Sequence, residues 1–389
     1  MNRRNPMFHR TLFEPEHDMF REAFRRFVET EITPNHTGWE ADQHVSREAW
    51  LKAGEQGFLC PTMPEEYGGA GVDRRFSLII LEELFGANAS GPGFALHSDI
   101  VAPYILNYGT REQKQAWLPK MATGEVIGAI AMTEPGPGSD LQGIKTRSVV
   151  DDDDLVLDGE KIFITNGYMA DLVIVAAQVV DPAVGGEPKL SLVLVEAGRD
   201  GFTKEKPLKK LGQTAQDTCI LNFSGVRVPK SNLLGGENAV GSGLKMLFGE
   251  LAWERLMIAI GAVAGARFCY EQALSYTKER QAFGRPLAEF QDVRFKLADM
   301  KVQISAGQAM VDQCMTNLAL DKLRPEDSAG AKLWCSEMAF EVADTALQMH
   351  GGYGYMQEYP ITRAFADIRA HRIYGGANEI MKELISRKL

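Results

Sequence analysis

The stretch Ile130-Ala-Met-Thr-Glu-Pro-Gly-Pro-Gly-Ser-Asp-Leu-Gln-Gly143 decides the fold of this chain. An apolar run, residues 126–132, ends here at Thr133 and is followed by a loop with two prolines and three glycines. Because proline fixes φ and glycine permits positive φ, such a loop is stiff but strongly bent. Its backbone N–H groups and the Thr133 and Ser139 hydroxyls can face a polar ligand, such as a phosphate or the edge of a heterocycle. Taken alone, the loop is equally typical of a tight turn between strands.

A second long motif lies near the C-terminus. It is Gln348-Met-His-Gly-Gly-Tyr-Gly-Tyr-Met-Gln-Glu358, and it continues through Arg363 to Asp367. Together the two motifs resemble the acyl-CoA dehydrogenase family, whose flavin rests on a Met/Val-Thr-Glu-x-Gly-x-Gly-Ser-Asp segment. The resemblance covers the chain from about Phe8 onward. It is closest to the long-chain type, which ends like residues 373–384 here.

The composition is that of an ordinary globular protein. The chain has 389 residues, of which 45% are hydrophobic and 24% are charged, enough for two or three domains. The formal net charge of −10 argues against nucleic acid and anionic membranes as partners. Basic residues must therefore gather locally wherever an anionic coenzyme A thioester binds.

The five cysteines are scattered and form no C-x-x-C pair. They predict reduced thiols, without a disulfide framework or a metal site. The charge-free apolar run at residues 256–266 is too short for a membrane span, which needs roughly 20 residues. The N-terminus has no apolar segment and is short for a transit peptide. We therefore expect a cytoplasmic protein.

The period of the apolar residues divides the chain into three parts. Helical patterns occupy residues 14–124, including a helix at 14–33 stopped by Pro34 and one opened by Ser46 as N-cap. Strand patterns follow to about residue 228, and helical patterns return from residue 241. We predict an α+β fold of the acyl-CoA dehydrogenase type. Its parts are an N-terminal helical domain (1–125), a middle β-barrel-like domain (126–238) and a C-terminal four-helix bundle (239–389).

Two features of the middle part admit more than one interpretation. Residues 155–165 contain Asp158-Gly159 between apolar runs and predict a hairpin, with further strands at 172–180, 190–196 and 218–223. The four aspartates at 151–154 could form a metal site, but consecutive carboxylates repel one another, so a solvated turn is the better interpretation.

The resemblance implies FAD as the cofactor. A flavin needs hydrogen bonds at its pyrimidine edge and N5, cover on its ring faces, and donors for its pyrophosphate. Many relatives have Trp where this chain has Phe163, so the aromatic face is kept and the indole N–H is not; plain core packing is the alternative for Phe163. The residues assigned to this part of the cofactor site are Ile130, Ala131, Met132, Thr133, Gly138, Ser139, Phe163, Ile164 and Thr165.

Other cofactor contacts are implied at the C-terminal part. In relatives an Arg at the position of Arg280 reaches the cofactor of the neighbouring subunit; a solvated helix end is the alternative. The resemblance thus implies a homotetramer, a dimer of dimers with FAD at subunit interfaces. Ala377 replaces a Thr of relatives, which removes one hydroxyl contact. The residues assigned here are Arg280, Phe283, Gln291, Gln348, Met349, His350, Gly351, Gly352, Ala377, Asn378 and Glu379.

The catalytic base is assigned to Glu254. Some relatives carry the base at the position of Gly375, where this chain has none, and the long-chain type takes it from the helix of Glu254. Ile258, Gly261, Ala262 and Gly265 continue the same helical face, so a carboxylate there is desolvated and its pKa should rise. Glu250 is the rival, and a surface ion pair of Glu254 with Arg255 is the alternative. The substrate contacts assigned by resemblance are Ser139, Lys245, Ala252, Trp253, Arg255, Gly375 and Gly376.

The expected reaction is FAD-dependent α,β-dehydrogenation of a medium-chain, long-chain or branched fatty acyl-CoA to the trans-2-enoyl-CoA. Electrons would pass to an electron-transfer flavoprotein. A flavin oxidase or monooxygenase on the same scaffold is an alternative, as is a specialist for branched or terpenoid acyl groups such as a citronellyl-CoA-type dehydrogenase. A scaffold that only holds flavin is weaker, because the base and flavin motifs are both intact. The sequence leaves the acyl preference open.

Overall fold

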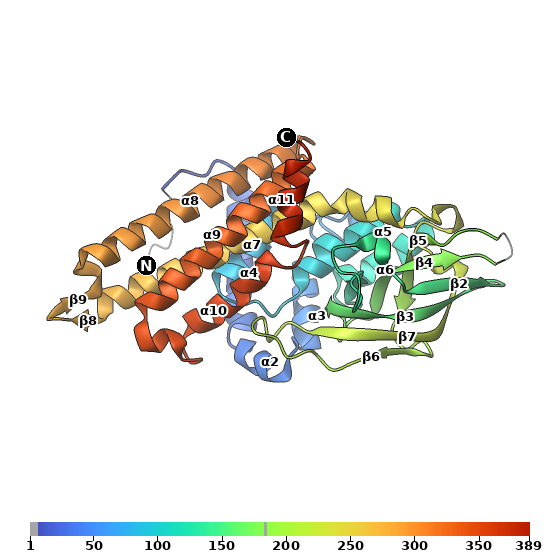
Figure 1. The fold of residues 1–389 in the computed structure, drawn as a ribbon, viewed down its shortest axis with the longest axis horizontal. Helices are drawn as coiled ribbons and strands as arrows, with labels where there is room; N and C mark the ends of the chain where they lie inside the picture. The colour runs from blue at the N-terminus through green and yellow to red at the C-terminus, as the bar shows by residue number, and fades with distance from the viewer. Residues whose placement is uncertain (1–6, 183–184) are drawn as a thin grey trace.

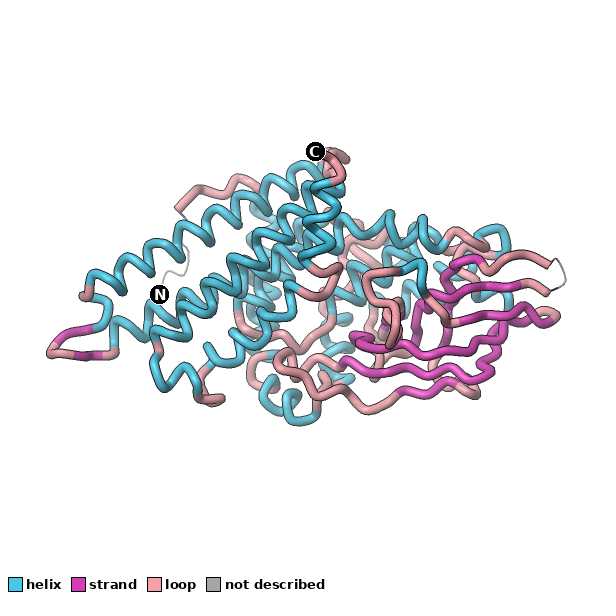
Figure 2. The backbone as a smooth tube through the Cα atoms, in the orientation of Figure 1, coloured by secondary structure: helices cyan, strands magenta, loops and turns pink. Residues whose placement is uncertain are grey.

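The computed structural model describes residues 7–182 and 185–389 as an elongated molecule, with a helical bundle at one end and a sheet at the other (Figures 1 and 2). The N-terminal helices are α1 (Pro15–Phe27), α2 (His36–Asp42), α3 (Arg47–Glu55), α4 (Arg74–Gly86), α5 (Ala102–Tyr108) and α6 (Arg111–Ala122). π-helical turns follow α1 (Val28–Ile32) and precede α5 (Leu96–Val101). Ser46 caps α3 as predicted, because its Oγ accepts the Ala49 N–H at 3.4 Å.

The middle part is one seven-stranded mixed sheet. Its strands are β1 (Gly128–Ala131), β2 (Arg147–Asp151), β3 (Asp154–Thr165), β4 (Leu172–Val180), β5 (Lys189–Glu196), β6 (Phe202–Lys204) and β7 (Thr218–Pro229). They are ordered β1-β4-β2-β3-β7-β6, with β5 also paired to β4. β1 pairs with the first half of β4 in parallel, with Ile130 opposite Ile174. This pairing places the end of β1, where the Gly/Pro loop begins, in the centre of the sheet.

The predicted hairpin at Asp158-Gly159 is wrong. β3 is a single twelve-residue strand, antiparallel to β2 on one side and to β7 on the other. Gly159 lies instead at a shift of register, where a Cβ would lie 2.5 Å from Thr146 Oγ1. The glycine therefore allows close approach of a neighbouring chain segment, and the turn signal has a different cause. The actual turn between β2 and β3 is at Asp152 and Asp153, both exposed, within the acidic run.

The C-terminal part is a bundle built on α7 (Gly243–Glu279), α8 (Gln291–Ala319) and α9 (Pro325–Met349). A short hairpin, β8 (Gln281–Ala282) and β9 (Arg285–Pro286), joins α7 to α8. The shorter α10 (Pro360–Ile368) and α11 (Asn378–Ser386) pack against α9. The predicted α+β architecture, with helical parts on either side of a central sheet, is confirmed.

The long helix α7 connects two apolar cores. Met246 and Leu247, near its start, pack with α5, α6 and one face of the sheet. Leu256, Ile260 and Val263, further along, pack with α4, α8 and α9 in the bundle core. Residues 250–255 therefore lie where the two cores meet, with α5 against them.

No helix in the described ranges is long and apolar enough to cross a membrane. All five cysteines are buried and free.

Candidate active site

Glu254 is buried on α7 at the junction of the two cores, with 6% of its surface exposed. The Tyr104 hydroxyl, from α5, donates a hydrogen bond of 3.1 Å to Glu254 Oε1. Burial raises the pKa of Glu254 to about 7, and the charge of Glu250 adds to the rise, although Tyr104 and Arg255 oppose it. A carboxyl with a pKa near neutrality is ionised often enough, and basic enough, to serve as a general base.

Glu250, the rival, lies one turn earlier on α7 and is also buried. Its Oε1 accepts a hydrogen bond of 2.9 Å from the Asn107 amide, at the end of α5. Burial lowers the pKa of Arg74, and the nearby charge of Glu250 partly offsets this change. The two glutamates thus face the same helix α5 and differ in their partners, which are Tyr104 for Glu254 and both Asn107 and Tyr108 for Glu250.

Gly375 lies against α7 one turn after Glu254. A Cβ added to Gly375 would lie 2.2 Å from Ile258 Cδ1, and the glycine has φ +64°. The structure thus brings together the two positions from which relatives are expected to supply the base. Ile258 also fills part of the space that the missing side chain of Gly375 would otherwise leave open.

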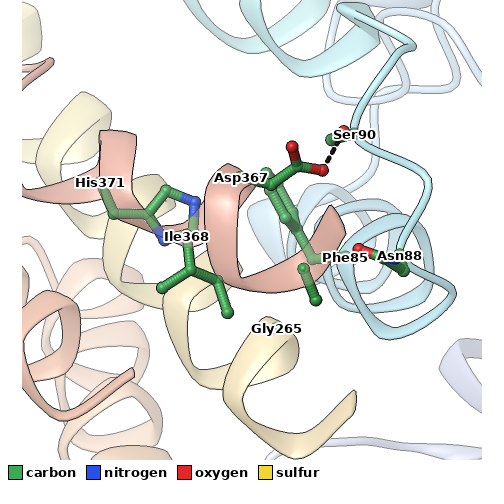
Figure 3. Close-up of a pocket in the computed structure, with 8 residues that line it drawn as sticks. Phe85, Asn88, Ser90, Gly265, Asp367, Ile368 and His371 are labelled. Carbon is green, nitrogen blue, oxygen red and sulfur yellow. Dashed lines mark hydrogen bonds between the residues drawn. The ribbon is translucent and has the colours of Figure 1, made fainter. Parts of the chain in front are cut away.

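The small-residue face of α7 packs closely against its neighbours. A Cβ at Gly261 would lie 2.9 Å from the Phe85 ring, and one at Gly265 would lie 3.3 Å from Ile368. Gly265 also lines a closed cavity of about 10 Å³, with Asp367 and His371 on its wall (Figure 3). Such a volume holds about one water molecule. The cavity is therefore too small to receive an acyl chain.

A buried ion pair holds the Gly/Pro loop against β3. Lys161, with 0% of its side chain exposed, donates to Glu134 Oε1 at 2.8 Å and to the Met132 carbonyl at 3.1 Å. Glu134 also accepts the backbone N–H groups of Lys145 and Thr146, at 2.7 and 2.8 Å. Burial lowers the pKa of Lys161 to about 8, while Glu134 opposes that change. These contacts tie both ends of the loop, residues 132–146, to one point on β3.

The surface above this ion pair offers an aromatic ring and open backbone. Phe163 has φ +61° at an irregularity of β3, and its side chain is 63% exposed. Core packing of Phe163 is therefore excluded in the single chain. Gly138 has open space around it, Ser139 is exposed, and Thr133 and Thr165 are half-buried. Ile130, Ala131 and Ile164 are buried. A ligand on this surface would therefore contact mainly their backbone atoms or the residues next to them, and not their side chains.

The C-terminal loop is held in a similar way by a second buried lysine. Lys332 on α9 donates to the Gly376 carbonyl at 2.8 Å and to Asn378 Oδ1 at 2.7 Å. The Asn378 amide in turn donates to Ser336 and Glu337. The Asn378 side chain is therefore directed into the protein. Ala377 caps α11 and is half-buried, and Glu379 is exposed.

A separate hollow of about 500 Å³ lies at the far end of the bundle, beside β8 and β9 (Figure 1). Arg280 lines it and lies 5.8 Å from the centre of the Tyr353 ring. Phe283, at the tip of the hairpin, is 97% exposed. Gln291 begins α8 and Gln348 lies near the end of α9. The hollow is also lined by Met349, His350, Gly351 and Gly352.

The hollow lies beside β8, at the end of the bundle that is far from the sheet carrying the Gly/Pro loop, as the positions of β8 and of β2–β5 in Figure 1 show. One subunit therefore cannot offer both groups of residues to the same cofactor. Phe283 and Arg280 are exposed together at this hairpin, and both residue types are enriched at protein interfaces.

Four of the seven residues assigned to the substrate lie along α7. Lys245 is exposed, Ala252 is half-buried and Arg255 is buried beside Glu254. Arg255 Nε has no hydrogen-bond partner among the described residues, and burial lowers the pKa of its guanidinium. Trp253 is directed into the bundle core, where Arg74 covers its ring at 4.6 Å.

Four residues around the site were not found from the sequence: Tyr104, Asn107, Lys161 and Lys332. Tyr104 and Asn107 lie in an apolar helical pattern that shows no sign of a contact to α7. The two lysines are of a residue type that is almost always exposed, so nothing local marks them as buried. One acid–histidine group among the described residues, Glu14, Glu16 and His17, has the spacing of metal ligands. His17 Nδ1 already accepts the Glu14 N–H at 3.1 Å within the cap of α1.

Comparison with known proteins agrees with these features along the whole chain. Residues 14–125, 129–226 and 241–389 match the models of the acyl-CoA dehydrogenase N-terminal, middle and C-terminal domains. The chain is 48% identical to the mitochondrial long-chain specific acyl-CoA dehydrogenase of Sus scrofa, over 98% of this chain and 88% of that protein. It is similar to the crystal structure of an acyl-CoA dehydrogenase from Geobacillus kaustophilus, with TM-score 0.94 and 46% identity, covering 98% of this chain and 99% of that one.

The exposed Phe163 ring beside the bent loop, and the arginine-lined hollow, fit a flavin and its diphosphate. A solved structure of acyl-CoA dehydrogenase from Bacillus anthracis is complexed with FAD. It matches this chain with TM-score 0.89 and 31% identity, covering 97% of this chain and 66% of that one. The cofactor of this chain is FAD. With three matching domains and near-complete coverage by relatives, this oxidoreductase belongs to the acyl-CoA dehydrogenase family.

Proposed function

We propose that this enzyme converts a fatty acyl-CoA to the trans-2-enoyl-CoA, with Glu254 as the base that removes the α-proton. The observation that carries the proposal is the buried Glu254 carboxyl, whose pKa burial raises to about 7, one helical turn before the residue that contacts Gly375. Bound FAD supplies the acceptor for the hydride that leaves the β-carbon as the Cα–Cβ double bond forms. Glu254 takes the α-proton, so the two hydrogens leave as a proton and a hydride.

The chain's own groups prepare the proton transfer. Tyr104 holds one Glu254 oxygen at 3.1 Å and leaves the other free to face the substrate. We assign the backbone N–H of Gly375 to the thioester carbonyl oxygen, where it would stabilise the charge that develops as the α-proton leaves. Arg255, with an unsatisfied Nε in the described structure, is a donor to the substrate region.

The cofactor assignments follow the two regions of the structure. Residues 130–133, 138–139 and 163–165 would contact the flavin bound to their own chain, together with residues 377–379. Arg280, Phe283, Gln291 and residues 348–352 would contact the cofactor of a neighbouring subunit, since the hollow lies at the other end of the molecule (Figure 1). This arrangement requires at least a dimer, and we propose a homotetramer that passes its electrons to an electron-transfer flavoprotein.

We also propose domain boundaries after residues 125 and 238, and a reducing, cytoplasmic location, which the five free thiols favour.

The substrate class is a medium-chain, long-chain or branched acyl group. A branched or terpenoid specialist is supported by Gly375, which adds no side chain beside the acyl chain. Ile258 limits this support, because its Cδ1 already occupies the position of the missing Cβ.

The proposal is tested by mixing the oxidised holoenzyme anaerobically with straight, 3-methyl and terpenoid-like acyl-CoAs. Bleaching of the flavin absorbance and formation of the enoyl-CoA by at least one of them is the expected result. Reoxidation in air should be slow and reoxidation by an artificial electron acceptor fast. Rapid reoxidation in air would favour the oxidase or monooxygenase, and absence of reduction by every acyl-CoA would refute the dehydrogenase.

A further inference from the structure

Lys332 is a buried cation that contacts no carboxylate among the described residues, although the charges of Glu337 and Glu379 act on it from a distance. None of its side chain is exposed, and its ammonium donates to two neutral oxygens, the Gly376 carbonyl and Asn378 Oδ1, at 2.8 and 2.7 Å. Burial and the nearby charge of Arg255 lower its pKa to about 8. Burying an ammonium is unfavourable unless hydrogen bonds compensate it. A neutral residue would fill the same space without the cost of burying a charge. The hydrogen bonds of Lys332 to Gly376 and Asn378 therefore call for a specific explanation.

The loop that Lys332 holds is also attached on both sides of its two glycines, and the Tyr374 hydroxyl within it is hydrogen-bonded to the Gln213 side chain. Glu337, also on α9, pairs with Arg372 at 2.7 Å before the loop and accepts the Asn378 amide at 2.7 Å after it. Between these anchors lie Gly375 and Gly376, with φ +64° and +93°. Consecutive glycines have the widest choice of backbone conformation. The orientation of their peptide groups must therefore be imposed by a contact from outside the loop.

The Lys332 ammonium supplies that contact at the Gly376 carbonyl. We propose that Lys332 is a positioning residue of the acyl-CoA site, which helps to direct the Gly375 N–H at the thioester oxygen by holding the Gly376 carbonyl, at the far side of the two glycines. The inference rests on the proposed role of the Gly375 N–H. Lys161 provides a natural comparison, because it is equally buried but holds the loop at residues 132–146.

The test compares Lys332→Met with Lys161→Met in the FAD-saturated holoenzyme. The measurement is the carbonyl stretching frequency of bound enoyl-CoA by difference infrared spectroscopy, with kcat, KM, flavin content and melting temperature recorded in parallel. The wild type should lower this frequency relative to free enoyl-CoA. Lys332→Met should lose most of that shift, retain FAD, and show kcat reduced about tenfold to a hundredfold, below the 10²–10³ of a fully lost donor. Lys161→Met should lose FAD more readily yet keep the shift once FAD is restored.

The outcomes separate the two ideas. A wild type without any shift would refute the role of the Gly375 N–H in the proposed function. A wild-type shift that survives unchanged in Lys332→Met would overturn the positioning role alone. If Lys332→Met does not fold, Asn378→Ala leaves the ammonium with one acceptor instead of two and should lose part of the shift. A folded Asn378→Ala variant with the full wild-type shift would also overturn the inference.

Discussion

Glu254 is surrounded by side chains of its own chain, whereas Arg280 faces an open hollow at the opposite end of the bundle (Figure 1). At the first site a phenol holds one carboxyl, and burial raises the pKa of that carboxyl to about 7 although the phenol opposes the change. At the second, Arg280 is exposed beside the Tyr353 ring, and Phe283 is 97% exposed. In the arrangement proposed above, the comparison separates two tasks: the chemistry is prepared inside one subunit, and retention of the cofactor depends on a second subunit. Variants of the first site should change rate, and variants of the second should change affinity.

The largest effect is expected at the base. Glu254→Gln keeps the shape and most hydrogen bonding but cannot accept the α-proton, so flavin should bind while reduction by acyl-CoA slows about 10²–10⁴-fold. Rapid mixing of enzyme and substrate, followed through the flavin absorbance, measures this rate. Glu250→Gln is the matched control, because it removes a buried carboxylate one turn away and should leave most activity. Reduction of Glu254→Gln at the wild-type rate would place the base elsewhere.

The next effect concerns the hollow. Arg280→Ala should weaken FAD retention, since loss of a charge-assisted contact costs about 1.5–3 kcal/mol, roughly tenfold to a hundredfold in affinity. Flavin release on dilution, measured by ultrafiltration, should then follow dissociation of the oligomer. The rate of reduction at saturating FAD should change little, unlike that of the base variant. A monomer that keeps full FAD at working concentration would contradict the shared site.

The pH dependence sharpens the comparison further. Glu254 acts as a base only when it is ionised, and its pKa is raised to about 7. The rate of flavin reduction should therefore be constant well above pH 7 and fall about tenfold per pH unit well below it. Glu250→Gln should move the midpoint downward, because the Glu250 charge is one cause of the raised pKa. A profile without a midpoint between pH 5 and 9 would disagree with Glu254 as the base.

The sequence predicts much of this arrangement, but unevenly. β4 begins and ends with the apolar run, at Leu172 and Val180, and α9 begins at Pro325. Both could be predicted because the period of the apolar residues and the position of a proline are local signals. Asp158-Gly159 was misleading, since glycine serves close packing against Thr146 as well as turns. α2 was missed because only His36 and Trp39 of its seven residues are buried. The contacts of Tyr104 and Lys332 join distant segments, and nothing in a local pattern encodes such pairings.

The smallest effect is the most specific. Glu254→Gly with Gly375→Glu moves the carboxylate to the position that other relatives use, and both positions must reach the same α-carbon. The structure adds two obstacles, a positive φ that costs about 1–3 kcal/mol for a residue with a Cβ, and Ile258 Cδ1 only 2.2 Å from that Cβ. Ile258→Val removes that one atom at a cost of about 0.5–1.5 kcal/mol. The triple variant should therefore reduce its flavin faster than the double variant, although both remain well below the wild type. Branched acyl-CoAs should regain the least rate, because the new side chain fills the space beside the acyl group. Equal rates for the double and triple variants would show that the Ile258 Cδ1 methyl group does not hinder a glutamate at residue 375. The two base positions would then differ by more than this one methyl group.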